Sequence, residues 1–228
     1  MIDIGNRIIT TIERPRQNLI DQFRGIPSSN IGDMMNRLYC MRSYIKAMTD
    51  RPLLGTAFTV KAPDGDNVFL HRALDLAAPG DVIVVDGGGC INRSLMGEIM
   101  FTYAQQRGIS GFVLDGAIRD VDSLSHLSIS VYARSVTPQG PYKNGPGEIN
   151  VPISCGGQVV MPGDIIAGDA DGICVIRASE AEKIVEAVRK KFADEQIQLE
   201  QYNAGILNQQ KHEDNYIAVT SKINTVYY

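Results

Sequence analysis

Short apolar runs separated by glycine, proline and aspartate fill the middle of the chain. Runs of this length, rich in β-branched residues, are typical of buried strands, and two longer stretches between them have helical character. The alternation predicts a mixed α/β domain. The expected strands are Gly55–Lys61, Val82–Asp86, Gly111–Leu114, Ser130–Ala133, Val159–Met161 and Ile173–Ile176, and the expected helices are Val68–Ala77 and Ser94–Arg107.

Two Pro-Gly-Asp sequences stand directly before apolar runs. They are Pro79–Asp81 and Pro162–Asp164. Because proline and glycine suit tight turns, each motif predicts a turn that brings an aspartate to the start of a strand.

The two ends of the chain have a different pattern from this core, which spans residues 51–178. Residues 1–50 are expected to form a helical arm, since Ile31, Met34, Met35 and Leu38 recur at the spacing of one helix face.

Residues 179–228 are expected to form a helix and a tail. Ser179 and Glu182 resemble a capping box, which predicts a long helix that ends near Gly205. Residues 208–214 are polar and expected to be mobile, and the last stretch, 216–228, has enough β-branched and aromatic residues for a strand.

Composition narrows the function classes. The 228 residues are 44% hydrophobic and 21% charged, with a net charge of −4. This is a globular balance without the basic patch that nucleic-acid binding favours, and no nucleic-acid partner is expected. No apolar run suits a secretory signal or a membrane span. The four cysteines form no CxxC pair and are expected to be reduced, as in a cytoplasmic protein.

The first segment with candidate chemistry is VIVVDGGGCINRSLMGE. Three glycines between a strand and a helix allow a backbone to approach an anion, although a tight turn is the simpler interpretation. A dinucleotide fingerprint would need glycine where Asn92 stands, so that interpretation fails. A methyl-donor loop is a weaker alternative, because the strand before these glycines is not the first.

The second segment is GFVLDGAIRDVD, where Arg119 and Asp120 follow an apolar strand. Arginine binds carboxylates through two parallel hydrogen bonds, and aspartate offers a hard oxygen to Mg²⁺. The pair therefore suits a polar site at a strand end, and a solvated ion pair in a loop is the alternative. Asp169–Gly172 lacks the remaining ligands of a calcium loop and predicts a turn. The three histidines are scattered, so zinc catalysis is not indicated.

Taken in order, these blocks resemble a known family. It contains the 4-hydroxy-4-methyl-2-oxoglutarate/4-carboxy-4-hydroxy-2-oxoadipate aldolases and the regulator of ribonuclease activity A. The resembling blocks are GDNVFLHRALDLAAPGDVIVVDGGG, MGEI, GFVLDGAIRD and PGDIIAGDADGICVI, within about Ser28–Gly205. The most specific element is a spacing, since 20 residues separate Glu98 from Arg119, and Asp120 follows directly.

The resemblance implies a fold, an assembly and a site. The fold is a swivelling β/β/α domain of the phosphohistidine-domain type, a single domain with N-terminal helices and a long C-terminal helix. The assembly is a homotrimer or homohexamer, with a pyruvate aldolase site that depends on Mg²⁺ or Mn²⁺ between adjacent subunits.

The resemblance also implies roles for single residues. Asp120 resembles the metal ligand, and Arg119 the residue that holds the keto and carboxylate oxygens of the substrate. Glu98 resembles the carboxylate that positions water for proton transfer, and Glu195 a residue that reaches into a neighbour's site. The backbone amides that bind the pyruvyl carboxylate correspond to Gly97, Glu98, Ile99 and Met100.

Elementary chemistry agrees with these roles. Cleaving a carbon–carbon bond beside a ketone leaves an enolate, which a cation and an arginine stabilise. No lysine lies in the motifs to form a Schiff base. The expected function is a metal-dependent aldolase acting on a 4-hydroxy-2-oxo acid, with oxaloacetate decarboxylation as a side activity. The alternative is a non-enzymatic regulator that binds a ribonuclease.

Overall fold

A computed structural model of the chain describes residues 3–223. The chain divides into two compact units, of which the first ends at Val188 and the second begins at Arg189. Each unit is described by itself below, and the candidate chemistry at Glu98, Arg119 and Asp120 lies in the first.

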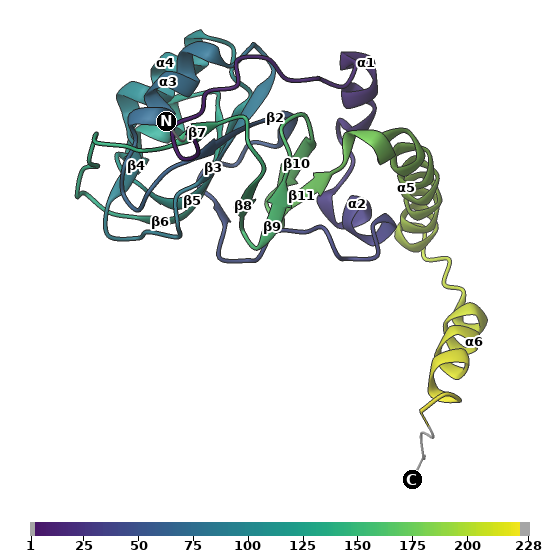
Figure 1. Cartoon of the computed structure of the whole chain (residues 1–228). Coiled ribbons are helices and arrows are strands. Elements are labelled where there is room, and N and C mark those ends of the chain that lie inside the picture. The colour runs from purple at the N-terminus through teal and green to yellow at the C-terminus, as the bar shows by residue number, and fades with distance from the viewer. Residues whose placement is uncertain (1–2, 224–228) are drawn as a thin grey trace. The chain divides into compact units, whose positions relative to one another are not determined.

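The first unit is built around one sheet, in which β1, β6, β5, β3, β2, β10 and β11 are neighbours in that order (Figure 1). β10 (Ile165–Asp169) and β11 (Gly172–Ile176) form an antiparallel hairpin, and β10 also pairs with β2. Three short strands, β1 (Lys46–Ala47), β4 (Ser94–Met96) and β7 (Glu148–Ile149), pair with β6, β5 and β2. The four central strands run parallel, and they are β2 (Leu53–Lys61), β3 (Asp81–Asp86), β5 (Gly111–Ile118) and β6 (Ser130–Val136).

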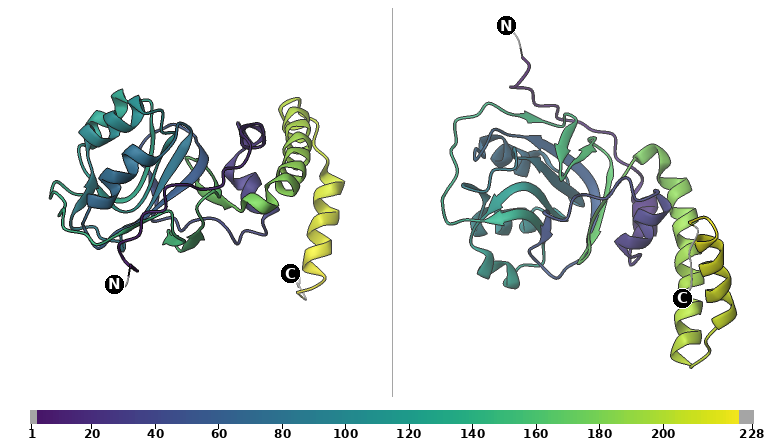
Figure 2. Two further views of the ribbon diagram at one scale, coloured as in Figure 1. Left: turned by 45° about the horizontal axis from the view of Figure 1, so that its top comes forward. Right: turned by 90° about the horizontal axis from the view of Figure 1, so that it is seen from below.

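Both faces of the parallel strands are covered, which explains their continuous apolar sequences. Ile83 and Val85 of β3 point into a cluster with α3 (Val68–Leu76) and α4 (Glu98–Gln106). Their neighbours along the strand, Val82 and Val84, point to the opposite face, where β8 (Ile153–Cys155) and β9 (Gln158–Val160) pack. Helices, sheet and small hairpin thus form the three layers visible in Figures 1 and 2. This arrangement confirms the expected mixed α/β fold.

A third apolar cluster covers the β10–β11 hairpin. It combines Phe23 and Ile31 near the N-terminus with Ile165 and Ile176 of the hairpin and Val188 of α5. The elements that supply it are short, apart from α5. They are α1 (Gln17–Ile20), η1 (Asp21–Phe23), α2 (Ser28–Met34), η3 (Ala178–Glu180) and α5 (Ala181–Asn203).

Both Pro-Gly-Asp motifs form the predicted turns. Asp81 is 1% exposed and accepts hydrogen bonds from Ala78 N–H at 2.8 Å and from the Arg14 guanidinium at 2.7 and 2.9 Å. Asp164 likewise accepts from Met161 N–H within its own turn and pairs with Arg177. An arginine distant in sequence therefore neutralises the buried aspartate of the Asp81 turn.

The expected N-terminal helix is shorter than its periodicity suggests. α2 begins at Ser28 and ends at Met34, and Leu38 is 68% exposed rather than on a buried helix face. Asn36 and Arg37 adopt positive φ angles of 55° and 62°, which stop the helix. The expected helical start at Ser94 is also wrong, because residues 94–96 form β4 and α4 begins at Glu98.

The long helix near the C-terminus is present, with a different start. Ser179 lies inside the 3₁₀ turn η3, so it is not the N-cap of α5. Gly205 is the predicted stop, since it adopts φ 75° and Ile206 N–H donates to Gln201 O at 2.9 Å, as in a Schellman motif.

The second unit also corrects the expectation for the tail. Residues 209–220 form the helix α6 (Gln209–Thr220), rather than a mobile segment followed by a strand. Asn208 caps this helix by accepting a hydrogen bond from Lys211 N–H at 2.9 Å. Of the expected terminal strand, residues 224–228 lie outside the described residues.

Candidate active site at the carboxyl end of β5

Arg119 and Asp120 follow the end of β5, beside the N-terminus of α4. β4 pairs in parallel with the last part of β5, and Arg119 N–H donates to Met96 O at 3.0 Å. α4 begins at Glu98, with Gly97 as its N-cap. Asp120 Oδ2 accepts a hydrogen bond from Glu98 N–H at 3.1 Å. The short strand β4 therefore brings together the two motifs that 20 residues separate in sequence.

The backbone of Asp120 has the left-handed conformation, with φ 58° and ψ 38°. Few residues other than glycine adopt it, and such strained positions gather at functional sites. Ser123 stabilises the turn, because its N–H and its hydroxyl both donate to Asp120 O, at 3.2 and 2.7 Å. The turn ends the strand and aims the Asp120 carboxylate at the first turn of α4.

Position 97 requires glycine because the side chains of Arg119 and Asp120 lie so close to it. Its backbone angles do not require glycine, since a φ of −146° is open to any residue. A Cβ atom at this position would lie 2.3 Å from Asp120 Oδ2 and 3.0 Å from both Cγ and Nε of Arg119. The missing side chain therefore lets the carboxylate and the guanidinium both lie against the start of α4.

The Arg119 guanidinium is only weakly engaged within the first unit. Its Nε lies 3.5 Å from Asp120 Oδ2, and the two side chains are 43% and 44% exposed. The pair is thus half-exposed, as the ion-pair interpretation expects, but the aspartate is also bound to a helix N-terminus. Because an arginine has five N–H donors, most of them remain available to a ligand.

A loop over residues 137–145 passes beside this guanidinium. Gly140 lies close to it, since a Cβ there would lie 3.3 Å from Nη1. Arg93 holds the loop by donating to Gly140 O at 3.0 Å and to the Tyr142 hydroxyl at 2.7 Å. The buried Asp66 accepts two further backbone N–H groups of the loop, at 2.6 and 3.0 Å. Sequence reasoning missed Arg93 and Asp66, because bonds to backbone atoms have no residue pattern of their own.

The other predicted site residues differ in their surroundings. Met100 is 8% exposed and belongs to the core, whereas Ile99 is 84% exposed beside the site. The side chain of Glu98 is also exposed. Glu195 lies on α5 in the second unit, where Lys191 Nζ is 2.5 Å from its Oε1, and its part in a neighbour's site stays a prediction.

The glycine run after β3 forms a tight turn that leads into β4. Gly88 and Gly89 have φ angles of 65° and 73°, and Gly89 N–H donates to Asp115 O at 3.0 Å. The Asp115 carboxylate accepts from Arg134 Nε at 2.6 Å, and this hydrogen bond raises the pKa of Arg134. Asp115 lies within β5, the strand that Asp120 follows, and its carboxylate is therefore engaged in structural contacts.

The sequence pattern of the RraA-like family, described as Aldolase/RraA, matches residues 19–175. The chain belongs to this family. A protein of Halalkalibacterium halodurans named "Putative 4-hydroxy-4-methyl-2-oxoglutarate aldolase" is 41% identical over 180 residues, which cover 78% of this chain and 86% of the relative. The expected family is thereby confirmed.

Solved structures show that the RraA-like fold is shared. An uncharacterized protein from Pseudomonas syringae pv. tomato is similar with a TM-score of 0.76 at 23% identity, covering 87% of this chain and 98% of that one. Streptomyces coelicolor RraAS2, described as an unusual member of the RNase ES inhibitor RraA protein family, is similar with a TM-score of 0.72 at 26% identity. That match covers 85% of this chain and 99% of RraAS2.

The half-exposed carboxylate of Asp120 in this RraA-like chain has the chemistry that a hard divalent cation prefers. Within residues 3–223, no group of three or more histidine, cysteine, aspartate and glutamate side chains is placed to enclose a metal. Mg²⁺ commonly binds through one or two carboxylates together with water and substrate oxygens. A single half-exposed carboxylate, Asp120, therefore fits Mg²⁺ or Mn²⁺ and does not fit a closed structural zinc site.

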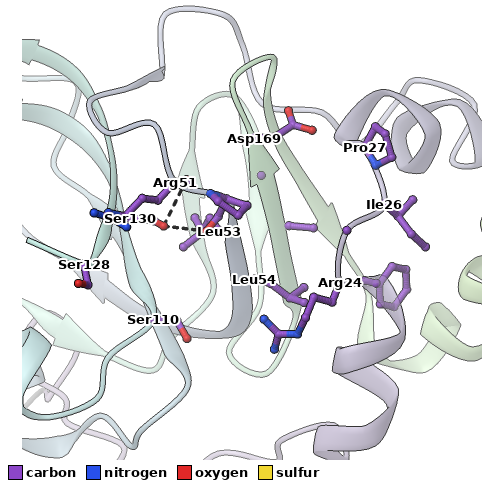
Figure 3. Close-up of a pocket in the computed structure, with 15 residues that line it drawn as sticks. Arg24, Ile26, Pro27, Arg51, Leu53, Leu54, Ser110, Ser128, Ser130 and Asp169 are labelled. Atoms are coloured by element: carbon purple, nitrogen blue, oxygen red, sulfur yellow. Dashed lines mark hydrogen bonds between the residues drawn. The ribbon is translucent and has the colours of Figure 1, made fainter. Parts of the chain in front are cut away.

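A cavity of about 580 Å³ lies at the other end of the parallel strands (Figure 3). Ser110 precedes β5, Ser130 begins β6, and both line this cavity together with Arg24 and Arg51. In sheets of this kind, ligands bind outside the carboxyl ends of the strands. Glu98, Arg119 and Asp120 lie at the carboxyl end, so the cavity is separate from the candidate active site.

None of the helices in the described part of the chain is long and apolar enough to cross a bilayer.

Proposed function

We propose that the chain is a divalent-metal-dependent pyruvate aldolase. Its substrate is a 4-hydroxy-2-oxo dicarboxylic or tricarboxylic acid of the 4-hydroxy-4-methyl-2-oxoglutarate type, which it cleaves to pyruvate and a second oxo-acid. The observation that carries the proposal is the contact of Asp120 with the first N–H of α4, beside the half-exposed Arg119. The names of the curated relatives support the same reaction class.

Two sources of positive charge meet where the pyruvyl end of the substrate would bind. Arg119 offers several N–H groups, which suit the keto oxygen and a carboxylate. The first-turn amides of α4 have no partners inside the helix and carry the positive end of its dipole, so they suit the pyruvyl carboxylate. The resemblance implies the amides of Gly97, Glu98, Ile99 and Met100. Glu98 N–H already donates to Asp120 Oδ2 at 3.1 Å and Met100 N–H to Gly97 O at 3.0 Å, so Ile99 N–H is the proposed amide donor to the carboxylate.

Asp120 would hold Mg²⁺ or Mn²⁺ through its half-exposed carboxylate. When bound, the cation supplies positive charge that stabilises the enolate left by carbon–carbon cleavage. Removal of the 4-hydroxyl proton needs a base, and the exposed Glu98 carboxylate can accept that proton through a water molecule. The same enolate forms when oxaloacetate loses carbon dioxide, so decarboxylation of oxaloacetate is the expected side reaction.

The open surface around Arg119 also supports a site that a second copy completes. The arginine and Asp120 are almost half exposed, and Ile99 beside them is 84% exposed. Enzyme sites normally exclude water, so a neighbouring subunit of a homotrimer or homohexamer is the proposed cover. Glu195 of that neighbour is the proposed additional carboxylate.

Pyruvate release tests the proposal directly. The purified chain is assayed with 4-hydroxy-4-methyl-2-oxoglutarate and with oxaloacetate, in Mg²⁺ and then in excess chelator. We expect activity with the metal and its loss with the chelator. Asp120→Ala should abolish the response to metal, and Arg119→Ala should lower the rate by at least roughly 10²-fold, as for other transition-state charge partners. Equal rates with and without metal would contradict the proposal.

The similarity to RraAS2 supports a second candidate function. A non-enzymatic regulator would bind a ribonuclease, and the net charge of −4 suits a basic partner. Direct binding of a purified ribonuclease, together with no turnover of any oxo-acid, would favour this function over the aldolase.

A further inference from the structure

Two cysteines that are far apart in sequence face each other beside β11. The Sγ atoms of Cys40 and Cys174 are 3.6 Å apart. The residues form an antiparallel bridge, flanked by hydrogen bonds from Met41 N–H to Ile173 O at 2.8 Å and from Val175 N–H to Tyr39 O at 3.0 Å. This pattern makes the cysteines a non-hydrogen-bonded pair, in which side chains lie closest together. Such a pair has Cα atoms close enough for a disulfide.

The surroundings keep both sulfur atoms in place. Cys174 is 1% exposed, and its thiol donates to Ser28 O at 3.2 Å. Gly32 leaves room for the other sulfur, since a Cβ atom there would lie 2.7 Å from Cys40 Sγ. Gln158 fixes the backbone on the far side by donating to Cys40 O at 2.9 Å. The contacts with Ser28, Gly32 and Gln158 thus keep the two cysteines facing each other.

The other two cysteines provide an internal comparison. Cys155 is the last residue of β8 and is completely buried. This burial raises the pKa of its thiol. Cys90 lies in the glycine-rich turn after β3. Among the residues that the structure describes, only the pair at Cys40 and Cys174 places two sulfur atoms in contact, and Cys40 is not fully buried.

We propose that Cys40 and Cys174 form a reversible intrachain disulfide by exchange with a small-molecule disulfide of the glutathione type. In the first step the Cys40 thiolate attacks one sulfur of the reagent, whose sulfur–sulfur bond breaks and releases one small thiolate. In the second step the Cys174 thiolate attacks the Cys40 sulfur and releases the second small thiolate. Two protein thiols are oxidised, the reagent is reduced to two thiols, and the two protons pass to the small thiolates.

The order of the steps follows from access. Cys40 is half-buried, whereas Cys174 is almost fully buried. Burial, followed by the neighbouring Cys40, raises the pKa of the Cys174 thiol, which makes it the poorer first nucleophile. A mixed disulfide on Cys40 is therefore the expected intermediate.

The cross-link would join the segment after α2 to β11 and enclose the strands between them. It restricts the unfolded chain over the whole sequence from Cys40 to Cys174, so the oxidised form should be more stable than the reduced form. This effect does not depend on the proposed aldolase activity, and neither cysteine belongs to the candidate active site.

The experiment treats the full-length chain with glutathione disulfide without denaturant. Thiols are then counted after denaturation, and peptides are mapped by mass spectrometry without reduction. We expect the count to fall from four to two, with one cross-linked peptide pair containing Cys40 and Cys174. The thermal midpoint should rise by roughly 5–10 °C and return after reduction, which is the scale for a long cross-linked loop.

Variants make the result decisive. Cys90→Ser should cross-link as the parent does, whereas Cys40→Ser should lose both the cross-link and the rise in midpoint. Cys174→Ala should stop at the mixed disulfide on Cys40. A different cysteine pair in the map, or a mixed disulfide on Cys40 that persists in the parent chain, would overturn the proposal. So would four thiols that remain after prolonged exposure.

Discussion

Gly97→Ala tests the geometry of the active site without removing a single polar group. The new Cβ atom would lie 2.3 Å from Asp120 Oδ2, whereas ordinary contacts begin at 3.4 Å. The carboxylate must therefore move by about 1 Å, and Arg119 must move with it, since two of its atoms lie 3.0 Å away. Displacements of about 1 Å from a productive geometry cost roughly 10²-fold in rate.

The expected result is a loss of roughly 10²-fold in pyruvate release, with little change in the thermal midpoint. Alanine suits the extended backbone at Gly97, so the fold itself has no reason to fail. Gly140→Ala is the matched control, because its Cβ would approach only the flexible end of Arg119, at 3.3 Å. The rates are measured with saturating Mg²⁺, and the midpoints by circular dichroism. Full activity in Gly97→Ala would refute the reasoning, as would an equal loss in the control.

Two predictions concern stability. Arg14→Ala should lower the free energy of unfolding by about 2–3 kcal/mol, because it leaves the buried Asp81 carboxylate without its positively charged partner. A urea titration measures this change. A decrease below about 0.5 kcal/mol, the level of ordinary surface substitutions, would contradict the prediction. The hydrogen bond from Arg7 lowers the pKa of Glu148 below its usual 4.5, so the stabilisation is complete above that pH and is lost as the pH falls through the lower folded-state pKa. Glu148→Gln should flatten the fall of the thermal midpoint below about pH 4.5, and an unchanged profile would count against the ion pair.

Much of the architecture follows from local sequence. Residues 82–85 of β3 and 112–114 of β5 are continuously apolar because both faces of a parallel sheet are covered. The Pro-Gly-Asp turns and the stop at Gly205 were predictable from local sequence. Proline fixes the φ angle, and glycine adopts φ angles that other residues rarely reach. The spacing from Glu98 to Arg119 likewise pointed to the candidate site.

Other features depend on contacts that no local pattern records. The apolar spacing continues to Leu38, but α2 stops at Met34 where the chain turns toward β11. Ser94–Met96 became a strand because the end of β5 offers free backbone partners, which override helical preference.

What the sequence by itself determined is the family, the order of the core elements and the residue types at the candidate site. The order of the core elements follows from periodicity and turn chemistry, which act over a few residues, and the family follows from the resemblance of the ordered sequence blocks. Only the tertiary structure decided that Gly97 must lack a side chain, that Arg14 neutralises Asp81, and that Cys40 meets Cys174. Such contacts join positions tens of residues apart, and their energy depends on distance and burial, which a chain acquires only when it folds.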